Sequence, residues 1–361
     1  MAGRKAENNK KNGWGRMKVL KILSLFTGAG GLDLGFLMAE HPEFKFKIVW
    51  ANDNFEPAIK TLHKNKRYFD DDVIIDSNDV WKIDFNNVPN CDGIIAGFPC
   101  QDFSVLSKRR GINVQRGQLY TRIVDVLRVK KPLFFVAENV KGLMSANKGE
   151  AIKIIGHEFE NPDGVEYKVR YDVINFANFG VPQLRKRVIF VGFRSDLGIK
   201  FEFPEGKFKN NPRTVEWAFN NPIDVRKVRF NNEKHKMRER TVKILKAIPP
   251  GGNYKDLKGK IDKDGKSLYV KGLMSNIYRR LRPKEPAYTV IARGGGGTWG
   301  YHHEEPRPLT NRERARLQTF PDDFEFIGNI GEVRTLIGNA VPPTGAKVIA
   351  ESILKIIGNK I

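Results

Sequence analysis

Cysteine and long apolar runs are scarce in this sequence, and acidic residues are fewer than basic ones. Cys91 and Cys100 are its only cysteines, so a disulfide framework is excluded and a reducing compartment is favoured. No run approaches the ~18 apolar residues of a membrane span, and the polar N-terminus lacks the apolar core of a signal peptide. We therefore expect a soluble protein of the cytoplasm.

An excess of basic over acidic residues gives the chain a large positive charge. Lys and Arg number 63 against 41 Asp and Glu, which gives a formal net charge of +22. Such a surface attracts polyanions, and nucleic-acid phosphates are the commonest of these inside cells. A lysine-rich host composition would produce the same excess. The stretch 226–246 holds many of the basic residues, either as a solvated helix face or as a phosphate-facing surface.

The chain divides into regions that differ in composition and in the spacing of their apolar residues. Residues 1–17 are polar and are expected to form a disordered basic tail. Residues 18–200 alternate short apolar runs with amphipathic stretches, which predicts an α/β domain with a mostly parallel sheet. Residues 201–306 are rich in Pro, Gly, Asn and Lys and predict a small loop-rich domain. Helical spacing returns in residues 307–361, which we expect to pack back onto the first domain.

Short apolar runs in the first region are the expected strands. Their length and spacing are typical of strands that are buried on both faces of a sheet. The runs are Val19–Phe26, Phe46–Ala51, Gly93–Gly97, Leu133–Ala137, Tyr171–Asn175 and Val188–Phe193.

The first of these strands runs into a glycine-rich turn and an amphipathic helix. Residues 24–36 read Ser-Leu-Phe-Thr-Gly-Ala-Gly-Gly-Leu-Asp-Leu-Gly-Phe. Glycines here let a nucleotide-bearing ligand lie against the backbone, although a tight turn without a ligand also explains them. A dinucleotide fingerprint would need a third glycine where Asp33 stands, which disfavours a nicotinamide-dependent oxidoreductase. Asp53, 22 positions after Gly31, is either a ribose-binding carboxylate or the N-cap of the next helix.

Chemically active side chains follow the later strands. Cys100 comes after Pro99 on a turn, where a thiolate can act as a nucleophile; a small buried side chain is the other interpretation. Glu138 follows the next strand and should emerge at the same edge of the sheet. Arg185 and Arg187 point to one face, either as an ion-pair network or as groups that hold a carbonyl and a phosphate. The pattern predicts that a nucleophile and an acid converge.

In this order the motifs resemble those of the DNA (cytosine-5) methyltransferase family of bacterial restriction-modification systems. The resemblance extends over about residues 19–360. It implies a Rossmann-like catalytic and cofactor-binding domain that uses S-adenosylmethionine, over residues 18–200, and a target-recognition domain over residues 201–306. The motifs are Phe26-Thr27-Gly28-Ala29-Gly30-Gly31, Gly97-Phe98-Pro99-Cys100-Gln101, Glu138-Asn139-Val140, Gln183-x-Arg185-x-Arg187, Arg312-Glu313-x-Ala315-Arg316-x-Gln318-x-Phe320-Pro321 and Gly338-Asn339-Ala340-Val341-Pro342.

The resemblance also implies a reaction at a cytosine that has been flipped out of the DNA duplex. Cys100 would add to C6, so that C5 becomes nucleophilic enough to take the methyl group of S-adenosylmethionine. Glu138 would hydrogen-bond or protonate N3, and Arg187 would hold O2. Arg185 would orient the site and a nearby phosphate. Loss of the C5 proton and elimination of Cys100 would release 5-methylcytosine.

The resemblance assigns the remaining site residues by motif. The cofactor-binding set is Phe26, Gly28, Gly30, Gly31, Leu32, Asp53, Asp79, Val80, Pro99, Leu119, Asn339 and Ala340. Here Asn78-Asp79-Val80 stands where the family usually has Gly-Asp followed by Ile or Val. The DNA-binding set is Gln101, Ser104, Lys108, Arg109, Arg110, Gln183, Thr289, Arg293 and Gly294, with Arg293 as a reader of a guanine edge. No metal is expected.

The partners and the alternatives follow from the same resemblance. We expect double-stranded DNA as substrate, a monomer without a membrane, and a cognate restriction endonuclease that shares the site without forming a stable complex. The cell would be bacterial or archaeal, with the protein at the nucleoid when it acts. A transfer-RNA-methylating relative is an alternative, although Lys141-Gly142-Leu143 replaces the Cys-Phe-Thr usual in that branch. A noncatalytic DNA-binding relative is another, but it would need to have lost Cys100 or Glu138.

Overall fold

The computed structural model describes residues 17–99, 118–270, 274–293, 297–298 and 300–360. Within these residues, no helix is both long enough and apolar enough to cross a membrane.

A seven-stranded sheet forms the centre of the larger half, in the order β3-β2-β1-β4-β5-β8-β6. All neighbouring pairs from β3 to β5 are parallel, and β8 runs antiparallel to both of its neighbours. The predicted α/β architecture with a mostly parallel sheet is therefore confirmed. The strands are β1 (Lys18–Leu25), β2 (Phe44–Asn52), β3 (Ile74–Asp76), β4 (Gly93–Gly97), β5 (Phe134–Val140), β6 (Tyr167–Asn175) and β8 (Lys186–Arg194).

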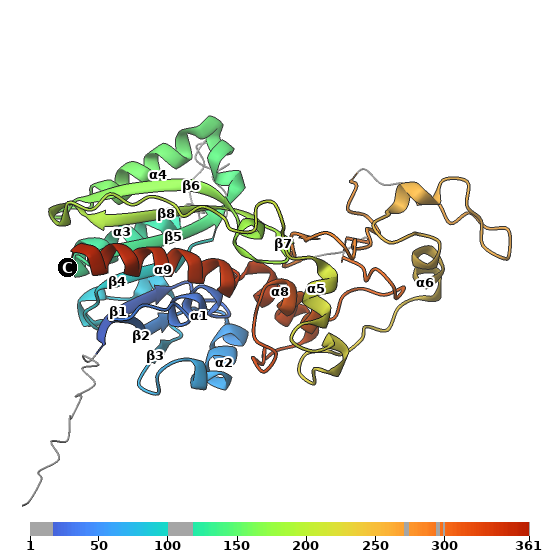
Figure 1. The fold of residues 1–361 in the computed structure, drawn as a ribbon, viewed down its shortest axis with the longest axis horizontal. Helices are drawn as coiled ribbons and strands as arrows, with labels where there is room; N and C mark the ends of the chain where they lie inside the picture. Colours follow the sequence, from blue (N-terminus) through green and yellow to red (C-terminus); the bar gives the residue numbers. More distant parts are fainter. Residues whose placement is uncertain (1–16, 100–117, 271–273, 294–296, 299, 361) are drawn as a thin grey trace, which may run out of the picture.

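Helices cover both faces of this sheet, because alternate residues of its central strands point to opposite sides. Ile95 and Val136 belong to one apolar cluster with side chains of α1 (Gly31–Leu37) and α9 (Pro343–Lys360). Their neighbours in sequence belong to a second cluster with α3 (Leu119–Lys130) and α4 (Glu150–Glu160). α2 (Glu56–Lys64) adds its apolar side to the first face. The result is a three-layer domain (Figure 1).

The C-terminal helix α9 packs directly on α1. A Cβ on Gly35 of α1 would lie 2.3 Å from the Cβ of Ala346 in α9, so only glycine permits this approach. Figure 1 shows α9 running across the sheet toward the end of the molecule where the chain finishes.

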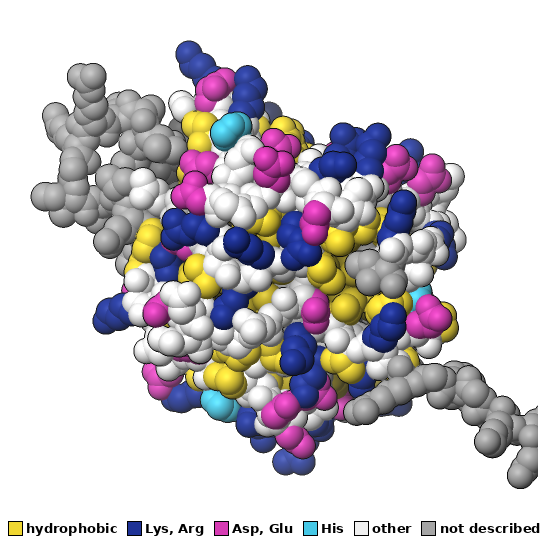
Figure 2. Space-filling view, turned by 90° about the vertical axis from the view of Figure 1, so that its left-hand side faces the viewer, with side chains coloured by type: hydrophobic (Ala, Val, Ile, Leu, Met, Phe, Trp, Pro, Cys, Tyr) yellow, Lys and Arg dark blue, Asp and Glu magenta, His cyan; other side chains and the backbone are white. Residues whose placement is uncertain are grey.

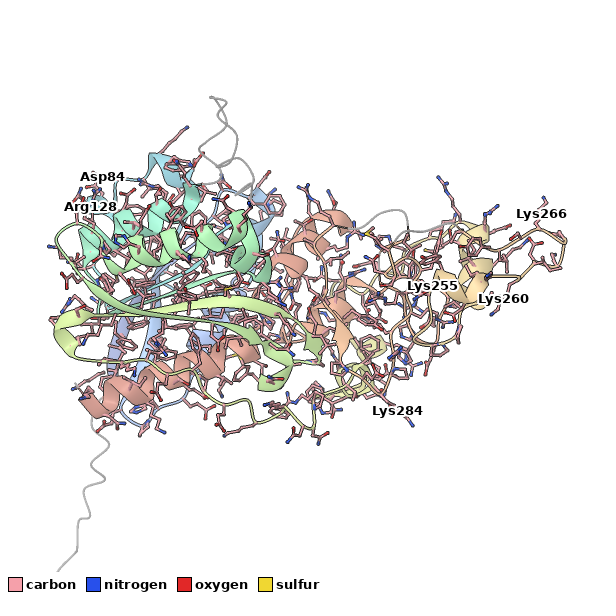
Figure 3. The ribbon with its side chains drawn as sticks, turned by 90° about the horizontal axis from the view of Figure 1, so that it is seen from above. Asp84, Arg128, Lys255, Lys260, Lys266 and Lys284 are labelled. Carbon is pink, nitrogen blue, oxygen red and sulfur yellow. The ribbon has the colours of Figure 1, made fainter. Side chains whose placement is uncertain are left out.

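The loop-rich region extends away from the sheet, with α6 at its outer part (Figure 1). Figure 3 places Lys255, Lys260 and Lys266 toward the outer end, opposite Asp84 and Arg128 on the sheet domain. The elements here and at the junction are β7 (Gln183–Leu184), paired in parallel with β9 (Ala287–Tyr288), α5 (Val215–Asn220), α6 (Glu239–Lys246), α7 (Asn311–Leu317) and α8 (Ile330–Asn339). Short 3-10 helices are η1 (Lys66–Tyr68), η2 (Val80–Lys82), η3 (Phe85–Asn87), η6 (Lys141–Gly149), η7 (Phe176–Phe179), η8 (Ser195–Leu197), η9 (Val225–Lys227) and η10 (Tyr254–Leu257).

The junction between the two halves has its own apolar cluster. It joins Val215 and Phe219 of α5 to side chains of α7 and α8, and Leu34 of α1 contributes from the sheet domain. The start of the 201–306 region is thus packed against the helices that follow it. On the end of the sheet domain seen in Figure 2, Lys and Arg alternate with Asp and Glu rather than forming one positive patch.

Candidate active site

A cavity of about 1190 Å³ opens at the carboxyl edge of the sheet, where β1, β2, β4 and β5 end. The sheet order reverses direction there, since β2 lies on one side of β1 and β4 on the other. Ligands of open α/β sheets bind at such a switch point. The wall of the cavity includes Phe26 after β1, Asp53 after β2, Pro99 after β4 and Glu138 in β5.

The glycine-rich turn closes one side of the cavity. Gly28 adopts a positive φ of 56°, and no heavy atom would lie within 4 Å of a Cβ placed there. A Cβ on Gly31 would instead lie 2.2 Å from the carbonyl oxygen of Val341, so this glycine lets α1 approach the segment after α8. The turn therefore exposes backbone to a ligand at Gly28 and packs closely at Gly31.

Asp53, which follows β2, connects the end of this strand to the glycine-rich turn by hydrogen bonding. Its carboxylate accepts hydrogen bonds from the N–H of Gly28 at 2.8 Å and from the N–H of Phe55 at 2.9 Å. The N-cap of α2 is Phe55, so Asp53 is not the cap of that helix. Burial raises the pKa of Asp53, while these backbone donors lower it in part. Asp53 thus lies in the cavity wall beside the open backbone of Gly28.

The other predicted cofactor residues surround the same space. Asp79 caps η2 by accepting the N–H of Trp81 at 3.1 Å. Gly30 is the only predicted cofactor residue outside the wall, and it is the buried N-cap of α1 beneath the turn. Those in the wall are Phe26, Gly28, Gly31, Leu32, Asp53, Asp79, Val80, Pro99, Leu119, Asn339 and Ala340.

Glu138 and Arg187 form an ion pair in the wall of the cavity. The Nε of Arg187 lies 2.8 Å from a carboxylate oxygen of Glu138, and both side chains are largely buried. Register explains the pairing, because β5 and β8 are neighbours and Arg187 lies opposite Val140, two residues from Glu138. Burial raises the pKa of Glu138, although the guanidiniums of Arg187 and Arg185 oppose the shift. Burial therefore makes the Glu138 carboxyl group easier to protonate than an exposed one.

Arg185 lies inside the protein rather than at a surface. It is fully buried and donates to the carbonyl oxygens of Val290, Gly338 and Asn339 at 3.3, 3.0 and 3.4 Å. Burial lowers its pKa to about 9. The expected phosphate contact does not fit this geometry, since no part of the guanidinium reaches solvent. Arg185 instead fixes the end of α8, which contributes Asn339 to the cavity.

Gln183 also departs from its expected role. It is fully buried, donates to the Leu317 carbonyl and the Gln318 side chain at 3.0 Å each, and accepts the N–H of Val290 at 2.8 Å. A direct DNA contact does not fit a side chain with all its polar atoms committed internally. Thr289 is exposed and donates to the Leu184 carbonyl at 2.6 Å.

Arg293 lies in the wall of the same cavity as Glu138 and is exposed there. Pro99, the last described residue before Cys100, lines the cavity too. Several predicted residues lie outside the part of the chain that the structure describes. They are Cys100, Gln101, Ser104, Lys108, Arg109, Arg110 and Gly294.

The cavity wall includes residues that the sequence motifs did not single out. Asp33 follows the glycine turn, and its place in the fingerprint was noted only as a missing glycine. On α8, Glu332, Thr335 and Leu336 precede Asn339 at helical spacing, which is a periodicity signal that could have identified them. Trp81 immediately follows the predicted pair Asp79 and Val80 in the chain.

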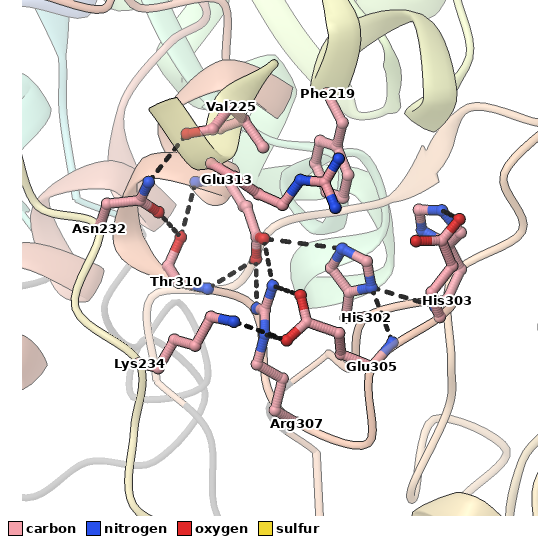
Figure 4. A network of polar contacts seen from close by, with 12 residues as sticks. Phe219, Val225, Asn232, Lys234, His302, His303, Glu305, Arg307, Thr310 and Glu313 are labelled. Carbon is pink, nitrogen blue, oxygen red and sulfur yellow. Dashed lines mark hydrogen bonds and ion pairs between the residues drawn. The ribbon is translucent and has the colours of Figure 1, made fainter. Parts of the chain in front are cut away.

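A buried polar network fixes the chain where the loop-rich region returns to α7 (Figure 4). Arg307 donates to Glu313 at 2.7 and 2.8 Å and to Glu305 at 2.9 Å. Lys234 adds a hydrogen bond to Glu305 at 2.7 Å, and Thr310 donates to Asn232 at 2.8 Å. The network joins Lys234 of the basic stretch to α7, the helix that follows the loop-rich region.

His302, His303 and Glu304 come close enough to suggest a metal site, with potential ligand atoms within 4.8 Å of one another. The Nδ1 of His302, however, already accepts the N–H groups of Glu304 and Glu305 at 3.0 and 3.1 Å. The two imidazole rings are stacked, with centroids 4.5 Å apart, so they do not converge on one point. Burial lowers the pKa of His302 to about 3. We interpret this cluster as structural.

Comparison with known proteins gives one consistent result. A family model described as C-5 cytosine-specific DNA methylase matches residues 20–355. The chain is 48% identical over 345 residues to the Type II methyltransferase M.NgoFVII of Neisseria gonorrhoeae, covering 94% of this chain and 87% of the relative. It is 42% identical over 341 residues to M.BbvI of Brevibacillus brevis, covering 92% and 90%. A crystal structure of a putative DNA modification methyltransferase from an Escherichia coli prophage has a TM-score of 0.66 at 24% identity, covers 94% of this chain and 99% of that one, and shares the fold.

Proposed function

The chain belongs to the C-5 cytosine-specific DNA methylase family, and we propose that it methylates a flipped-out cytosine within one short double-stranded DNA sequence. As in its Type II relatives, the enzyme is the modification component of a restriction-modification system. The observation that carries the site assignment is the buried Glu138–Arg187 pair, which faces the same cavity as the glycine-rich turn.

The residues present fit S-adenosylmethionine as the methyl donor. When bound, this cofactor supplies an electrophilic methyl group. Gly28 offers open backbone, and Asp53 is placed to accept a ribose hydroxyl.

Cys100 and Glu138 have different roles in the proposed reaction at cytosine, one as nucleophile and the other as acid. The Cys100 thiolate forms a bond to C6, and the electron pair of the C5–C6 double bond moves to C5. Glu138, with its raised pKa, donates a proton or a hydrogen bond at N3 and so makes C6 more electrophilic. Arg187 holds the Glu138 carboxyl group in place and donates to O2. After C5 is methylated, its proton passes to water and the C5–C6 double bond re-forms. Sulfur leaves C6 with the bonding electron pair as a thiolate, and a proton donated at N3 returns to Glu138.

The position of Glu138 requires the base to leave the duplex. Glu138 is buried in the wall of the cavity, so a cytosine stacked inside DNA cannot reach it. Arg293 and Thr289 belong to the region 201–306, and Arg293 also lies in the wall of this cavity. Both are the proposed DNA contacts among the described residues. The loop-rich region 201–306 is the proposed target-recognition domain.

The substrate, oligomeric state, location and partner endonuclease complete the proposal. Double-stranded DNA is the substrate of the family. We further propose a monomer that acts at the nucleoid in the cytoplasm. A cognate endonuclease would cut the same sequence without forming a stable complex.

Sequencing of methylated DNA tests this function. Methyl-free plasmid is treated with the protein and S-adenosylmethionine, and cytosine methylation is mapped at single-base resolution. We expect modified cytosines at one short recurring sequence, and none with Cys100→Ala. Cys91→Ala is the matched control, because Cys91 is mostly buried, burial raises its pKa to about 12, and it lies before β4 rather than after it.

Other outcomes would contradict the proposal. Methylation that is retained by Cys100→Ala would remove the nucleophile assignment. Methylated cytosine found only when RNA is the substrate would favour the transfer-RNA branch.

A further inference from the structure

Arg279, in the loop-rich region before β9, has a guanidinium that is held in a fixed orientation while its side chain stays partly exposed. Its Cζ lies 4.1 Å from the centre of the Tyr288 ring, which is the geometry of a cation–π contact. Its Nε donates to the Ser275 carbonyl at 3.0 Å, and one Nη donates to the Ser275 hydroxyl. These contacts leave the positive charge without a carboxylate partner among the described residues.

The two neighbouring arginines are used differently. Arg280 is buried, and its guanidinium donates to four backbone carbonyl groups. Arg282 is exposed and forms an ion pair with Glu285 at 3.1 Å. Of these three arginines, Arg279 alone combines an oriented guanidinium, partial exposure and no acidic partner in the part of the chain that the structure describes.

The aromatic ring under Arg279 belongs to the junction beside the cavity. Tyr288 lies in β9, opposite Leu184 of β7, and Thr289, a proposed DNA contact, follows it directly. Three residues after Leu184, Arg187 lines the cavity. Specific protein–DNA interfaces bury about 1,000–2,500 Å² of protein surface, so DNA with a base in this cavity also covers the surface next to it. The β7–β9 pair is part of that adjacent surface.

We propose that Arg279 binds a phosphate of the DNA backbone beside the cavity. This inference rests on the proposed function, and none of the sequence motifs quoted above includes Arg279. Stacking on Tyr288 orients the guanidinium in advance, which lowers the entropy cost of forming a charge-assisted hydrogen bond. The Ser275 contacts use Nε and one Nη, and the other Nη has no acceptor among the described residues. One free donor group suits a single phosphate oxygen better than the two-donor contact that reads guanine.

The test measures the binding of two duplexes by fluorescence anisotropy at several salt concentrations, with S-adenosylhomocysteine in place of the methyl donor. One duplex carries the sequence that the wild type methylates, and the other is a scrambled duplex of equal length and composition. We expect Arg279→Gln to weaken the binding of both duplexes by the same factor, about 10-fold. The slope of log K against log salt should become shallower by about 1, because one phosphate contact is lost.

Arg282→Gln is the matched control. It removes the same charge three residues away, from a guanidinium that is already paired with Glu285, and should bind both duplexes within about 2-fold of the wild type. A second pair of variants tests the stacking on Tyr288. Tyr288→Phe keeps the ring and should bind as the wild type does. Tyr288→Leu removes the ring but keeps the Arg279 charge, so it should weaken both duplexes by about 2- to 5-fold, keep the salt slope and add no further loss to Arg279→Gln.

Three results would overturn the inference. Unchanged affinity and salt slope in Arg279→Gln would exclude a phosphate contact. A loss confined to the methylated sequence would identify Arg279 as a reader of bases instead. A matching fall in the affinity for S-adenosylhomocysteine would show that Arg279 only supports the folded structure. Failure of the wild type to methylate or bind any duplex would be a different result, because it would overturn the proposed function itself.

Discussion

The sheet domain buries apolar side chains on both faces of its central strands, whereas the outer loop-rich region depends on a small cluster and on polar contacts. That cluster contains Ile244, Ile248, Tyr254, Leu257 and Leu268. Beside it, the buried guanidinium of Arg280 donates to the carbonyls of residues 245, 248, 302 and 303 at 2.6–3.1 Å.

The difference suits the two tasks that we propose for these regions, which are catalysis at the edge of the sheet and sequence recognition by the loop-rich region. Bond formation at one carbon needs side chains held within fractions of an ångström, which a packed sheet provides. Sequence recognition needs loops that can differ between relatives while a few internal contacts keep their shape. The comparison predicts that mutations in the two regions will have different kinds of effect.

The largest effect is expected where the sheet domain performs chemistry. Glu138→Gln should lower the methylation rate constant by about 10²–10⁴-fold, because the amide cannot transfer a proton at N3. It should also remove the fall in rate at high pH, since in the wild type the active protonated form is lost as pH rises through the raised pKa of Glu138. Single-turnover rates across pH, with Glu160→Gln at the exposed end of α4 as control, measure both. An unchanged rate would show that the sheet edge is not the catalytic centre.

The next largest effect is global unfolding. Phe135→Ala should destabilise the sheet domain by about 3–5 kcal/mol, because it leaves a cavity beside Phe159 and Tyr167. Urea denaturation should show a lower midpoint, and cofactor affinity should fall together with the folded fraction. Ile154→Ala, on the exposed side of α4, should change stability by less than about 1 kcal/mol. Equal losses of stability in the two variants would mean that buried apolar packing does not stabilise the sheet domain as proposed.

A smaller and local effect is expected in the loop-rich region. Arg280→Met would leave several buried carbonyls without donors, at a cost of about 1–3 kcal/mol for each group left unpaired. Hydrogen exchange should increase around α6 and not in the sheet, and DNA affinity should fall while cofactor affinity remains. Arg282→Met removes an exposed guanidinium paired with Glu285 and serves as control. Loss of cofactor binding in Arg280→Met would show that the two halves are not independent.

The smallest effect concerns specificity. Arg293→Ala should weaken discrimination at one position of the target by about 1–3 kcal/mol while leaving cofactor affinity intact. Methylation sequencing would then show a relaxed site, and Lys284→Ala, at an exposed position, would not. An unchanged site would exclude Arg293 as a base-reading residue.

Much of the sheet domain is visible in the sequence. The run Gly93–Gly97 coincides with β4, and the runs for β1 and β2 differ from the strands by one or two residues. Such apolar runs are readable because both faces of a central strand are buried. β3 was missed because it has only three residues, none fully buried. The antiparallel direction of β8 was also missed, since apolar content does not encode strand direction.

Some residues of the candidate site could likewise be predicted from the sequence, and others could not. Glycines and acids at strand ends predicted the cavity wall well, because topology brings strand ends together. The burial of Gln183 and Arg185 was not foreseen, because their partners lie more than 100 positions away in the chain and a local motif does not reveal them.

The most direct test of the central claim is a covalent trap. DNA in which 5-fluorocytosine replaces cytosine is incubated with the enzyme and S-adenosylmethionine, because a fluorine at C5 cannot leave as the proton does. The account predicts a denaturation-resistant protein–DNA complex that requires the cofactor and whose cross-linked peptide contains Cys100. Absence of the complex under conditions where unmodified DNA is methylated, or a cross-link at Cys91, would contradict it.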